Sequence, residues 1–173
     1  MPLLIIQISI TFIVLVSAVY FIWSAIFSIP YWPSDKKFMN NLKKVLPPGE
    51  RIYVAELGAG DGRIAFALCK MGFMVDAFEI NPLLTIFIRL KKILIRERRL
   101  NVFNQDFMKS KINFAKYQAV VMYLEPNLME LLESKLFYEM SDGSIIISNT
   151  FRFPNKKAEN VYDKMLVYRV KRK

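Results

Sequence analysis

The sequence predicts an α/β domain, with a mostly parallel sheet and helices on both of its faces, preceded by one transmembrane helix. Three observations support this fold class. Residues 1–34 of the 173-residue chain contain no Asp, Glu, Lys or Arg, so an apolar segment precedes an ordinary mixed domain. From about residue 52 onward, short apolar segments alternate with segments of helical spacing, which is typical of parallel strands covered by helices. The first of these strands ends in a glycine-rich turn, and open α/β sheets bind ligands at such positions.

The N-terminal segment, residues 1–33, is predicted to be a single-pass membrane anchor. Residues 3–29 form one apolar run, which at roughly 1.5 Å per helical residue exceeds a hydrocarbon core of roughly 30 Å. Pro30 and Pro33 then end the helix. A cleaved signal peptide is the alternative, but it would need a basic leading segment, which the sequence does not contain. Because the nearest lysines follow the span, the positive-inside rule places the domain on the cytoplasmic side, or on the equivalent matrix side.

Residues 34–50 are predicted to form an amphipathic helix (35–46) and a linker at Pro47-Pro48-Gly49, and residues 51–173 are predicted to form the domain itself. The predicted strands are 51–57, 73–80, 101–104, 119–124 and 144–148. The predicted helices are 64–71, 82–99 and 128–140. The strand 119–124 is apolar throughout, which is typical of burial on both faces. Because the segment after the fifth strand is short, we expect the final hairpin to be reduced to one edge strand, 161–170.

The composition excludes several kinds of site. The chain has no histidine and a single cysteine, Cys69, so a Ser–His–Asp hydrolase and an internal disulfide are excluded and no metal site is expected. The net charge of +10 indicates an anionic partner. The cations gather at Lys36, Lys37, Lys43 and Lys44, in the predicted helix at Arg89, Lys91, Lys92, Arg96, Arg98 and Arg99, and at Lys171, Arg172 and Lys173. Cations beside a span favour contacts with anionic lipid headgroups, with solvated faces as the alternative, and no motif indicates nucleic-acid binding.

The glycine-rich turn carries the most informative motif, Glu56 to Arg63. A dinucleotide fingerprint would require a third glycine where Arg63 stands. Glu56 and Asp61 would repel a pyrophosphate, but they suit a ligand that carries an ammonium and a sulfonium charge. This pattern favours S-adenosylmethionine over NAD. The predicted cofactor contacts in the turn are Glu56, Gly58, Ala59, Gly60, Asp61 and Gly62.

Two further loops follow the second and third predicted strands and extend this cofactor site. Glu79 is placed to accept both ribose hydroxyl hydrogens, and Ile80 and Asn81 follow it in the same loop. Asp106 is placed to accept from the adenine amino group, and Phe107 to pack on the base. Each acid alone has a structural alternative, as a helix-capping residue. Jointly, the acids at 56, 61, 79, 106 and 125 predict a local acidic cleft.

The end of the fourth strand is predicted to meet the substrate. An amine nucleophile must lose its proton before methyl transfer, since the pKa of a free lysine is about 10.4. Desolvation by aromatic side chains and a nearby acceptor would help. Tyr123 and Glu125 are therefore the catalytic candidates, with structural roles as the alternative. Pro126, Asn127 and Phe151 are the substrate-binding candidates, although Phe151 could also belong to the core.

These motifs resemble those of the seven-strand-type protein-lysine methyltransferases. That group comprises archaeal broad-specificity enzymes and membrane-anchored mitochondrial enzymes that modify the ATP synthase c-subunit and the adenine nucleotide translocase. The segment 57–64, Leu-Gly-Ala-Gly-Asp-Gly-Arg-Ile, matches the group's L/I-G-S-G-D-G-R-I with Ala for Ser, and 79–82 matches E-L/I-N-P. The segment 148–153 resembles S-x-x-F-x-F, and 30–33 a Pro-aromatic-x-Pro entry. Glu125-Pro126 departs from the pattern, which leaves the surroundings of the substrate lysine open.

The resemblance implies a Rossmann-like methyltransferase fold and S-adenosylmethionine binding by Glu56, Gly58, Gly60, Asp61, Glu79, Asn81 and Asp106. The expected function is an S-adenosylmethionine-dependent protein-lysine N-methyltransferase that acts on a membrane-associated protein. A methyltransferase with a small-molecule or lipid acceptor is the first alternative, because the apolar anchor and the basic helix suit a lipid-like substrate equally well. A cofactor-binding interaction module without catalysis is the second. The intact acids at 56, 61 and 79 argue against that second alternative.

Overall fold

In the first unit of the chain, residues 1–31, the described residues form the helix α1 (Pro2–Phe27). Large apolar side chains such as Phe12 and Phe21 are exposed along it. The computed structural model describes residues 2–27, 36–46 and 52–171. The predicted Pro30–Pro33 entry, the Pro47–Gly49 linker and Arg172–Lys173 lie outside these residues. Within this described part, no helix combines the length and apolar character needed to cross a membrane.

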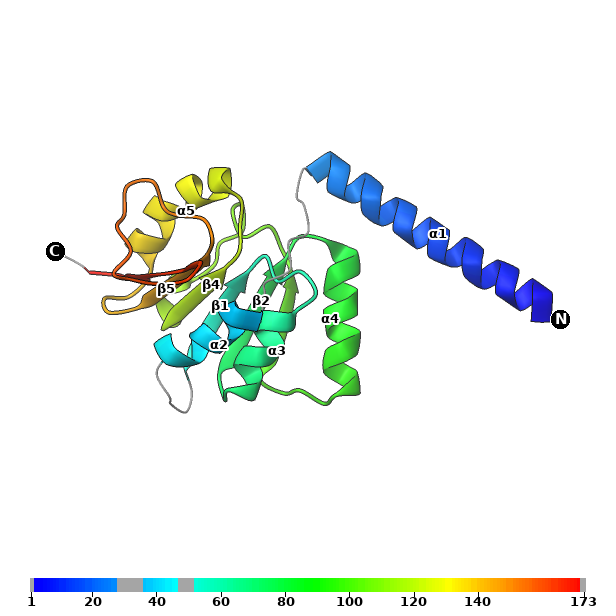
Figure 1. Cartoon of the computed structure of the whole chain (residues 1–173), viewed down its shortest axis with the longest axis horizontal. Helices are drawn as coiled ribbons and strands as arrows, with labels where there is room; N and C mark the ends of the chain where they lie inside the picture. Colours follow the sequence, from blue (N-terminus) through cyan, green and yellow to red (C-terminus); the bar gives the residue numbers. More distant parts are fainter. Residues whose placement is uncertain (1, 28–35, 47–51, 172–173) are drawn as a thin grey trace. The chain divides into compact units, whose positions relative to one another are not determined.

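The second unit, residues 32–173, is organised around one seven-stranded sheet (Figure 1). Its strands are β1 (Tyr53–Leu57), β2 (Met74–Glu79), β3 (Leu100–Asn104), β4 (Ala119–Met122), β5 (Ile145–Asn149), β6 (Asn160–Tyr162) and β7 (Met165–Arg169). Their order is β3-β2-β1-β4-β5-β7-β6. β1 to β5 are parallel, and β7 runs antiparallel to both β5 and β6. The carboxyl ends of β1, β2, β3 and β4 therefore share one edge of the sheet, as the sequence predicts.

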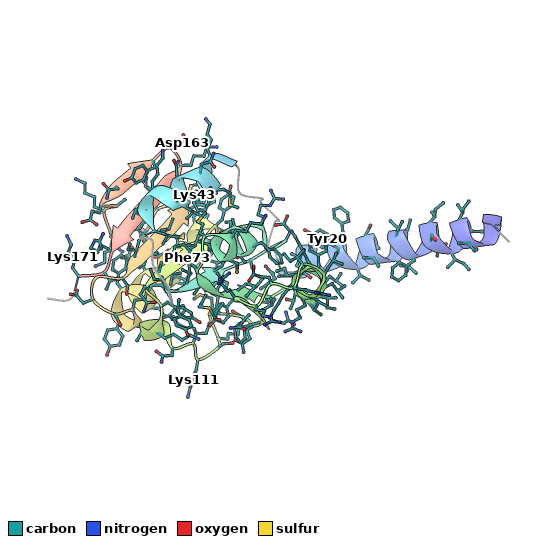
Figure 2. All side chains as sticks on the ribbon, turned by 90° about the horizontal axis from the view of Figure 1, so that it is seen from below. Tyr20, Lys43, Phe73, Lys111, Asp163 and Lys171 are labelled. Carbon is teal, nitrogen blue, oxygen red and sulfur yellow. The ribbon has the colours of Figure 1, made fainter. Side chains whose placement is uncertain are left out.

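The two faces of the sheet are covered differently. The helices are α2 (Lys36–Val45), α3 (Arg63–Lys70), α4 (Pro82–Leu94) and α5 (Pro126–Glu139), with a 3-10 turn η1 (Phe114–Lys116). One core cluster joins the sheet to residues of α2, α3 and α4, and it includes Phe73 near the centre of the unit (Figure 2). The other cluster joins the opposite face to α5 and η1. Every residue of β4 is buried, which confirms the prediction from its apolar pattern.

The expected loss of the final hairpin is wrong. β6 and β7 pair through Tyr162 and Met165, and β7 lies between β6 and β5 instead of at the edge. Asp163 makes the tight turn possible by adopting a φ of 57°, a conformation that Asp tolerates better than most residues. Figure 2 shows Asp163 at the periphery of the unit. The prediction of a single strand rested on the short segment after the fifth strand, but the turn between Tyr162 and Met165 takes only two residues, so both strands fit.

The predicted helix 82–99 is also too long, because α4 ends at Leu94. Arg96 has a φ of 55°, its backbone N–H donates to the Ile93 carbonyl, and that of Glu97 donates to the Lys92 carbonyl at 3.0 Å. This pair of bonds is common at the C-terminus of an α-helix, where one residue adopts a left-handed conformation. Glycine normally occupies that position, which is Arg96 here. Arg96, Arg98 and Arg99 therefore follow the helix and do not belong to it. β4 likewise ends at Met122, so Tyr123 lies just beyond the strand.

Candidate functional site

The glycine-rich turn is tied to the end of β2 by its backbone. Gly58 and Ala59 donate their N–H groups to the Phe78 carbonyl at 2.9 and 3.0 Å. Gly58 has a φ of 75°, and a Cβ atom there would lie 2.8 Å from Leu124 Cδ2. The positive φ favours glycine at this position, and any larger residue would also require the Leu124 side chain to shift. Gly62, also at a φ of 75°, occupies the position before α3, where a Cβ atom would press on Ile88.

Glu79 lies at the centre of this arrangement and is buried. Its Oε2 accepts the Gly60 N–H at 2.7 Å and its Oε1 accepts the Asn81 N–H at 2.8 Å. Burial raises the pKa of this carboxyl, although the backbone hydrogen bonds from Asn81, Gly60 and Ile80 oppose the shift. A carboxylate offers about four acceptor positions, and the backbone bonds from Asn81, Gly60 and Ile80 do not fill all of them, so capacity for a ligand hydroxyl remains. The side chain thus combines a structural role with the predicted ribose contact.

Glu56 lies beneath the same turn, and fewer hydrogen bonds offset the burial of its carboxylate. It is 2% exposed, and its Oε2 is buried with no hydrogen-bond partner. Burial raises the pKa of Glu56 well above the ordinary value, a backbone hydrogen bond from Ala65 lowers it, and the charges of Glu79 and Asp61 raise it further. The three acids therefore converge, as predicted for this part of the cleft. Buried polar atoms in proteins nearly always have a partner, so the free oxygen is consistent with a cationic or hydrogen-donating ligand.

Asp61 is paired within the turn itself. Arg63 Nη2 lies 2.7 Å from Asp61 Oδ2, and Arg63 Nε lies 3.0 to 3.1 Å from the two carboxylate oxygens. The ion pair is partly exposed, with side-chain exposures of 42% for Arg63 and 26% for Asp61. The sequence predicts that the negative charge of Asp61 interacts with a cationic ligand. In the structure this charge is already paired with Arg63. In the sequence, Arg63 stands out only as a missing glycine, although its spacing from Asp61 is visible there.

Asn81 and Asn104 hold the Glu79 loop in place. Asn81 is buried, and its Oδ1 caps α4 by accepting the Leu83 N–H at 2.9 Å. Ile80, beside it, is half-buried. Asn104 Nδ2 donates to the carbonyls of Glu79 and Ile80, both at 3.0 Å. Asn104 is missing from the predicted site, because its only signal in the sequence is its position at the end of a predicted strand.

Asp106 and Phe107 adopt largely structural positions. Asp106 Oδ1 accepts the Met108 N–H at 2.9 Å, and Oδ2 lies 3.4 Å from Lys109 Nζ. Asp106 therefore closes a turn and does not cap a helix, since no helix begins in the described segment between β3 and η1. Phe107 is 7% exposed and belongs to the core cluster with Phe78 and Phe114. Contacts of either residue with an adenine base remain predictions.

The aromatic pair Tyr123 and Phe151 brings together the segments that follow β4 and β5. The two rings are stacked, with centroids 6.1 Å apart and planes 28° apart, and both side chains are half-buried. Thr150 directs Phe151 by adopting a φ of 70°, while the Phe151 N–H donates to the Asn149 carbonyl at 2.8 Å. A β-branched residue with positive φ is strained, and such strain tends to occur at functional sites. Sequence reasoning had no signal for Thr150.

Glu125 precedes α5 but does not cap it with its side chain. Its Oε1 is buried without a hydrogen-bond partner, while its main-chain carbonyl accepts the Leu128 and Met129 N–H groups. Pro126 and Asn127 are exposed. Leu124, between Tyr123 and Glu125, lies so close to Gly58 that a Cβ atom at position 58 would contact its side chain. The segment 123–125 therefore lies against the glycine turn. Glu125, which is half-buried, and Glu56, which is buried, each have one buried oxygen without a hydrogen-bond partner.

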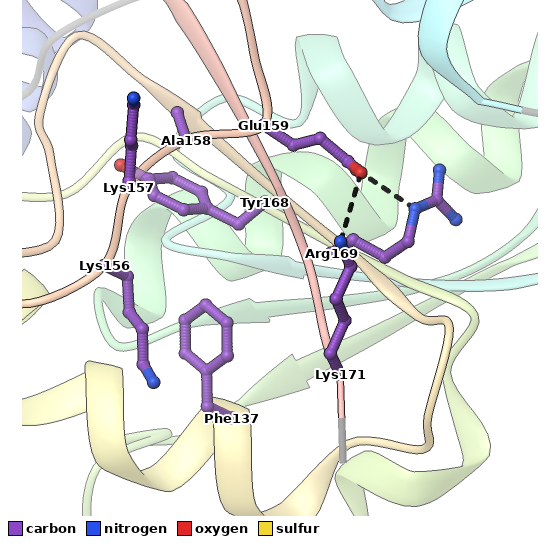
Figure 3. Close-up of a pocket in the computed structure, with 8 residues that line it drawn as sticks. All are labelled: Phe137, Lys156, Lys157, Ala158, Glu159, Tyr168, Arg169 and Lys171. Carbon is purple, nitrogen blue, oxygen red and sulfur yellow. Dashed lines mark hydrogen bonds and ion pairs between the residues drawn. The ribbon is translucent and has the colours of Figure 1, made fainter. Parts of the chain in front are cut away.

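A separate hollow of about 460 Å³ lies between α5 and β7 (Figure 3). It is lined by Phe137, Lys156, Lys157, Ala158, Glu159, Tyr168, Arg169 and Lys171. Glu159 pairs with Arg169 at 3.1 Å and with Lys171 at 3.6 Å. None of the residues predicted for the cofactor or the substrate lines this hollow, so it is distinct from the candidate site.

The chain is similar in sequence to known protein-lysine methyltransferases. The ATP synthase C-subunit lysine N-methyltransferase of Xenopus laevis is 33% identical over 138 residues, which cover 78% of this chain and 58% of that protein. A protein-lysine N-methyltransferase of Saccharolobus islandicus is 24% identical over 132 residues, covering 71% of this chain and 77% of that protein. The chain thus spans a little under two thirds of the length of the Xenopus relative.

The fold is that of S-adenosylmethionine-dependent methyltransferases. The crystal structure of an RNA methyltransferase from Salinibacter ruber, in complex with S-adenosyl-L-homocysteine, superposes with a TM-score of 0.75 at 21% identity. The match covers 82% of this chain and 95% of that one. The sequence profile of the ANTKMT methyltransferase domain matches residues 56–160, which include the glycine turn, the Glu79 loop and the Tyr123–Phe151 pair. Because this match spans more than half of the chain, the protein belongs to the ANTKMT methyltransferase domain family.

Proposed function

We propose that the protein is an S-adenosylmethionine-dependent protein-lysine N-methyltransferase. The observation that carries the cofactor assignment is the buried Glu56 oxygen without a partner, beside Glu79 and beneath a turn whose three glycines all adopt positive φ. These residues fit a ligand that carries an ammonium group and ribose hydroxyls. Glu56 would accept from the ammonium group, and Glu79 from the hydroxyls, while Gly58 keeps the turn close to Leu124. When bound, the cofactor supplies an activated methyl group.

Cofactor binding is tested by calorimetry on the full chain in detergent. We expect S-adenosylmethionine to bind and NAD not to bind, and we expect Glu79→Ala to abolish binding. Glu159→Ala is the matched control, because Glu159 is a partly exposed acid at the separate hollow of Figure 3. Binding that survives in the Glu79 variant, or that is lost equally in the Glu159 variant, would contradict the assignment.

The lysine acceptor is supported by the region around Tyr123. Stacked aromatic rings exclude water from a lysine side chain placed against them, and this desolvation lowers the pKa of its ammonium group toward neutrality. The free Glu125 oxygen is available to accept a hydrogen bond from the amine and orient it. In methyl transfer, orientation and proximity supply most of the rate acceleration. Glu125→Gln should therefore lower kcat while leaving S-adenosylmethionine affinity unchanged.

We infer that the substrate is a protein of the membrane or its surface, with the chain attached by its N-terminal helix. The names of the Xenopus relative and of a mouse relative, adenine nucleotide translocase lysine N-methyltransferase, refer to membrane-associated targets. The polar side chains of α1 bond within the helix, since the Ser9 and Thr11 hydroxyls donate to the Ile5 and Gln7 carbonyls at 2.9 Å. Polar side chains whose hydrogen bonds are made within the helix suit an apolar environment. The single span and the cytoplasmic or matrix-side placement of the domain remain part of this proposal.

Transfer of a tritiated methyl group identifies the acceptor. We expect labelled lysine in a membrane protein such as the ATP synthase c-subunit when purified chain is added to membranes stripped of their own activity. Label in the lipid fraction would favour the lipid acceptor instead. A folded chain that binds the cofactor but labels nothing would support the non-catalytic module.

A further inference from the structure

Helix α4 turns its apolar side outward. Toward the sheet it buries only Thr85 and Ile88, whereas α3 buries five of its eight residues. The large apolar side chains left outside are Ile86, Phe87, Leu90, Ile93 and Leu94, with exposures of 51%, 51%, 62%, 70% and 83%. Their spacing places them on one face of the helix. Contiguous exposed apolar surface of this kind marks an interaction site.

Cations flank this apolar face, which we call the α4 surface (Ile86, Phe87, Leu90, Ile93 and Leu94). Residues 82–99 contain six Lys or Arg and a single acid, Glu97. Arg89 donates to the Val102 carbonyl, and Lys91 lies over the Phe66 ring. The exposed residues Arg96, Arg98 and Arg99 form no ion pair within residues 52–171. Their charges are thus available to a partner.

We propose that the α4 surface lies flat on an anionic lipid bilayer. Amphipathic helices of this kind bury their apolar face about 5–10 Å into the headgroup boundary, with Lys and Arg on the polar side. Each such cation near an anionic surface adds electrostatic attraction. A bilayer with acidic lipids complements both halves of the surface, the apolar side chains through its acyl boundary and the arginines through its headgroups.

A second copy of the chain or the N-terminal helix would match only the apolar side chains of the α4 surface and not its cations. A second copy related by a two-fold axis would place the same patch opposite itself, and its cations would then repel one another. The N-terminal helix could cover the apolar side chains, but residues 1–34 contain no acid that could pair with the arginines. Charge complementarity therefore selects the lipid surface.

The position of α4 gives this contact a consequence for the candidate site. The helix begins at Pro82, directly after the Glu79–Asn81 loop, and it packs against β2 and β3. Seating it on a bilayer would hold the ligand-binding edge of the sheet beside the headgroups. The lipid contact itself involves no catalytic step. Only its use, access to lysines near the membrane surface, rests on the proposed function.

The test uses the full chain, labelled with nitrobenzoxadiazole at Leu90→Cys and reconstituted into vesicles. Cys69 can remain, because it is buried and burial raises its pKa to about 12. A label at Tyr138→Cys is the matched control, since Tyr138 is 84% exposed on α5. In vesicles of phosphatidylcholine and phosphatidylserine, we expect the emission at position 90 to shift to shorter wavelength and to be quenched by spin-labelled lipid. The label at position 138 should behave as in water.

Charge variants separate the bilayer from other occupants. Arg96→Gln/Arg98→Gln/Arg99→Gln should abolish the change at position 90. The matched variant Lys156→Gln/Lys157→Gln/Lys171→Gln removes as many charges at the hollow of Figure 3, near the other end of the sheet, and should retain it. Equal shielding in phosphatidylcholine alone, unaffected by the arginine changes, would overturn the proposal in favour of the N-terminal helix. Shielding that grows with protein density would overturn it in favour of a second copy.

Calorimetry on the same samples keeps the two proposals apart. If position 90 stays water-exposed while S-adenosylmethionine still binds, the lipid contact is wrong and the proposed function stands. If the lipid contact forms but no cofactor binds, the reverse holds.

Discussion

Asp76 and Glu56 are two buried carboxylates on neighbouring strands, and their surroundings are opposite. Asp76, 3% exposed in β2, accepts from Lys116 Nζ at 2.6 Å, the Tyr117 hydroxyl at 2.7 Å and Asn101 Nδ2 at 2.9 Å. Burial by itself raises the pKa of Asp76, but these three hydrogen bonds outweigh it, so the pKa is lowered. Glu56, 2% exposed in β1, keeps one oxygen without a partner, and its pKa is raised.

The difference distinguishes a carboxylate that holds the fold together from one that is available for a ligand. A buried charge is tolerated when it is paired and hydrogen-bonded, and it costs free energy when it is not. Asp76 lies within the sheet, where β3 and the segment around η1 supply the donors. Glu56 lies near the carboxyl edge, where the protein leaves a donor position open. Burial alone therefore does not identify a functional acid, whereas burial without a partner makes Glu56 a candidate for ligand binding.

The largest effect that we expect is the loss of stability in Asp76→Ala. The substitution leaves the Tyr117 hydroxyl, Asn101 Nδ2 and Lys116 Nζ without their shared acceptor. Because the Lys116 side chain is 46% exposed and water can solvate its charge, we expect a loss of about 2 kcal/mol, less than for a fully buried pair. Urea unfolding of the wild-type and variant chains measures the loss. At low denaturant, the folded variant should still bind S-adenosylmethionine. A variant of unchanged stability would remove the distinction between the two acids.

Glu56→Gln should show the converse behaviour. We expect S-adenosylmethionine affinity to fall at least tenfold, which is about 1.4 kcal/mol, because the ligand ammonium loses its charged acceptor. The free energy of unfolding should not fall, since the substitution removes an uncompensated buried charge. Calorimetry and urea unfolding on one preparation measure both quantities. Reduced stability with unchanged affinity would show that Glu56 is a structural residue.

Tyr117→Phe sharpens the comparison by removing one donor from Asp76. Net contributions of single buried hydrogen bonds are about 1 kcal/mol, so we expect the free energy of unfolding to fall by that amount. Tyr168→Phe serves as the control, because the Tyr168 ring is equally buried and its hydroxyl makes a longer bond, 3.3 Å, with the Phe153 N–H. Equal losses in both variants would mean that the Asp76 network adds nothing specific.

The smallest expected effect is a difference in pH dependence. The lowered pKa of Asp76 means that its contribution to stability is present above the ordinary aspartate range and is lost as the pH falls through the folded pKa. The raised pKa of Glu56 has the opposite sign, and its contribution is lost as the pH rises through the folded pKa. Stability of Glu56→Gln relative to wild type should therefore increase with pH above the ordinary glutamate range. A pH series of unfolding midpoints that ran the other way would contradict the assigned directions.

Much of the cofactor edge could be predicted from the sequence, because local signals are strong there. Glycines at 58, 60 and 62 after an apolar strand predicted the turn, and Asn81-Pro82 predicted the start of α4, which the Asn81 side chain caps. In a parallel sheet the strand ends meet at one edge, so the acids at 56 and 79 were expected to converge. The interaction of Glu56 with Glu79 and Asp61 confirms this part of the expected acidic cleft, whereas the convergence of Asp106 and Glu125 with them stays a prediction.

Other features depended on contacts that no local pattern reveals. Three residues adopt positive φ: Arg96 ends helix α4, Thr150 orients Phe151, and Asp163 closes the final hairpin. None of the three is a glycine, so no signal in the sequence indicates these conformations. The pairing of Asp61 with Arg63 and the burial of Phe107 are likewise outcomes of packing.

The sequence by itself determined the fold class, the position of the ligand edge and the identity of the acids there, because periodicity and turn chemistry are local properties. Only the tertiary structure decided which buried acid keeps a free oxygen and which side of α4 remains outside. Hydrogen-bond partners and burial come from segments distant in the chain, and their arrangement exists only once the sheet has formed.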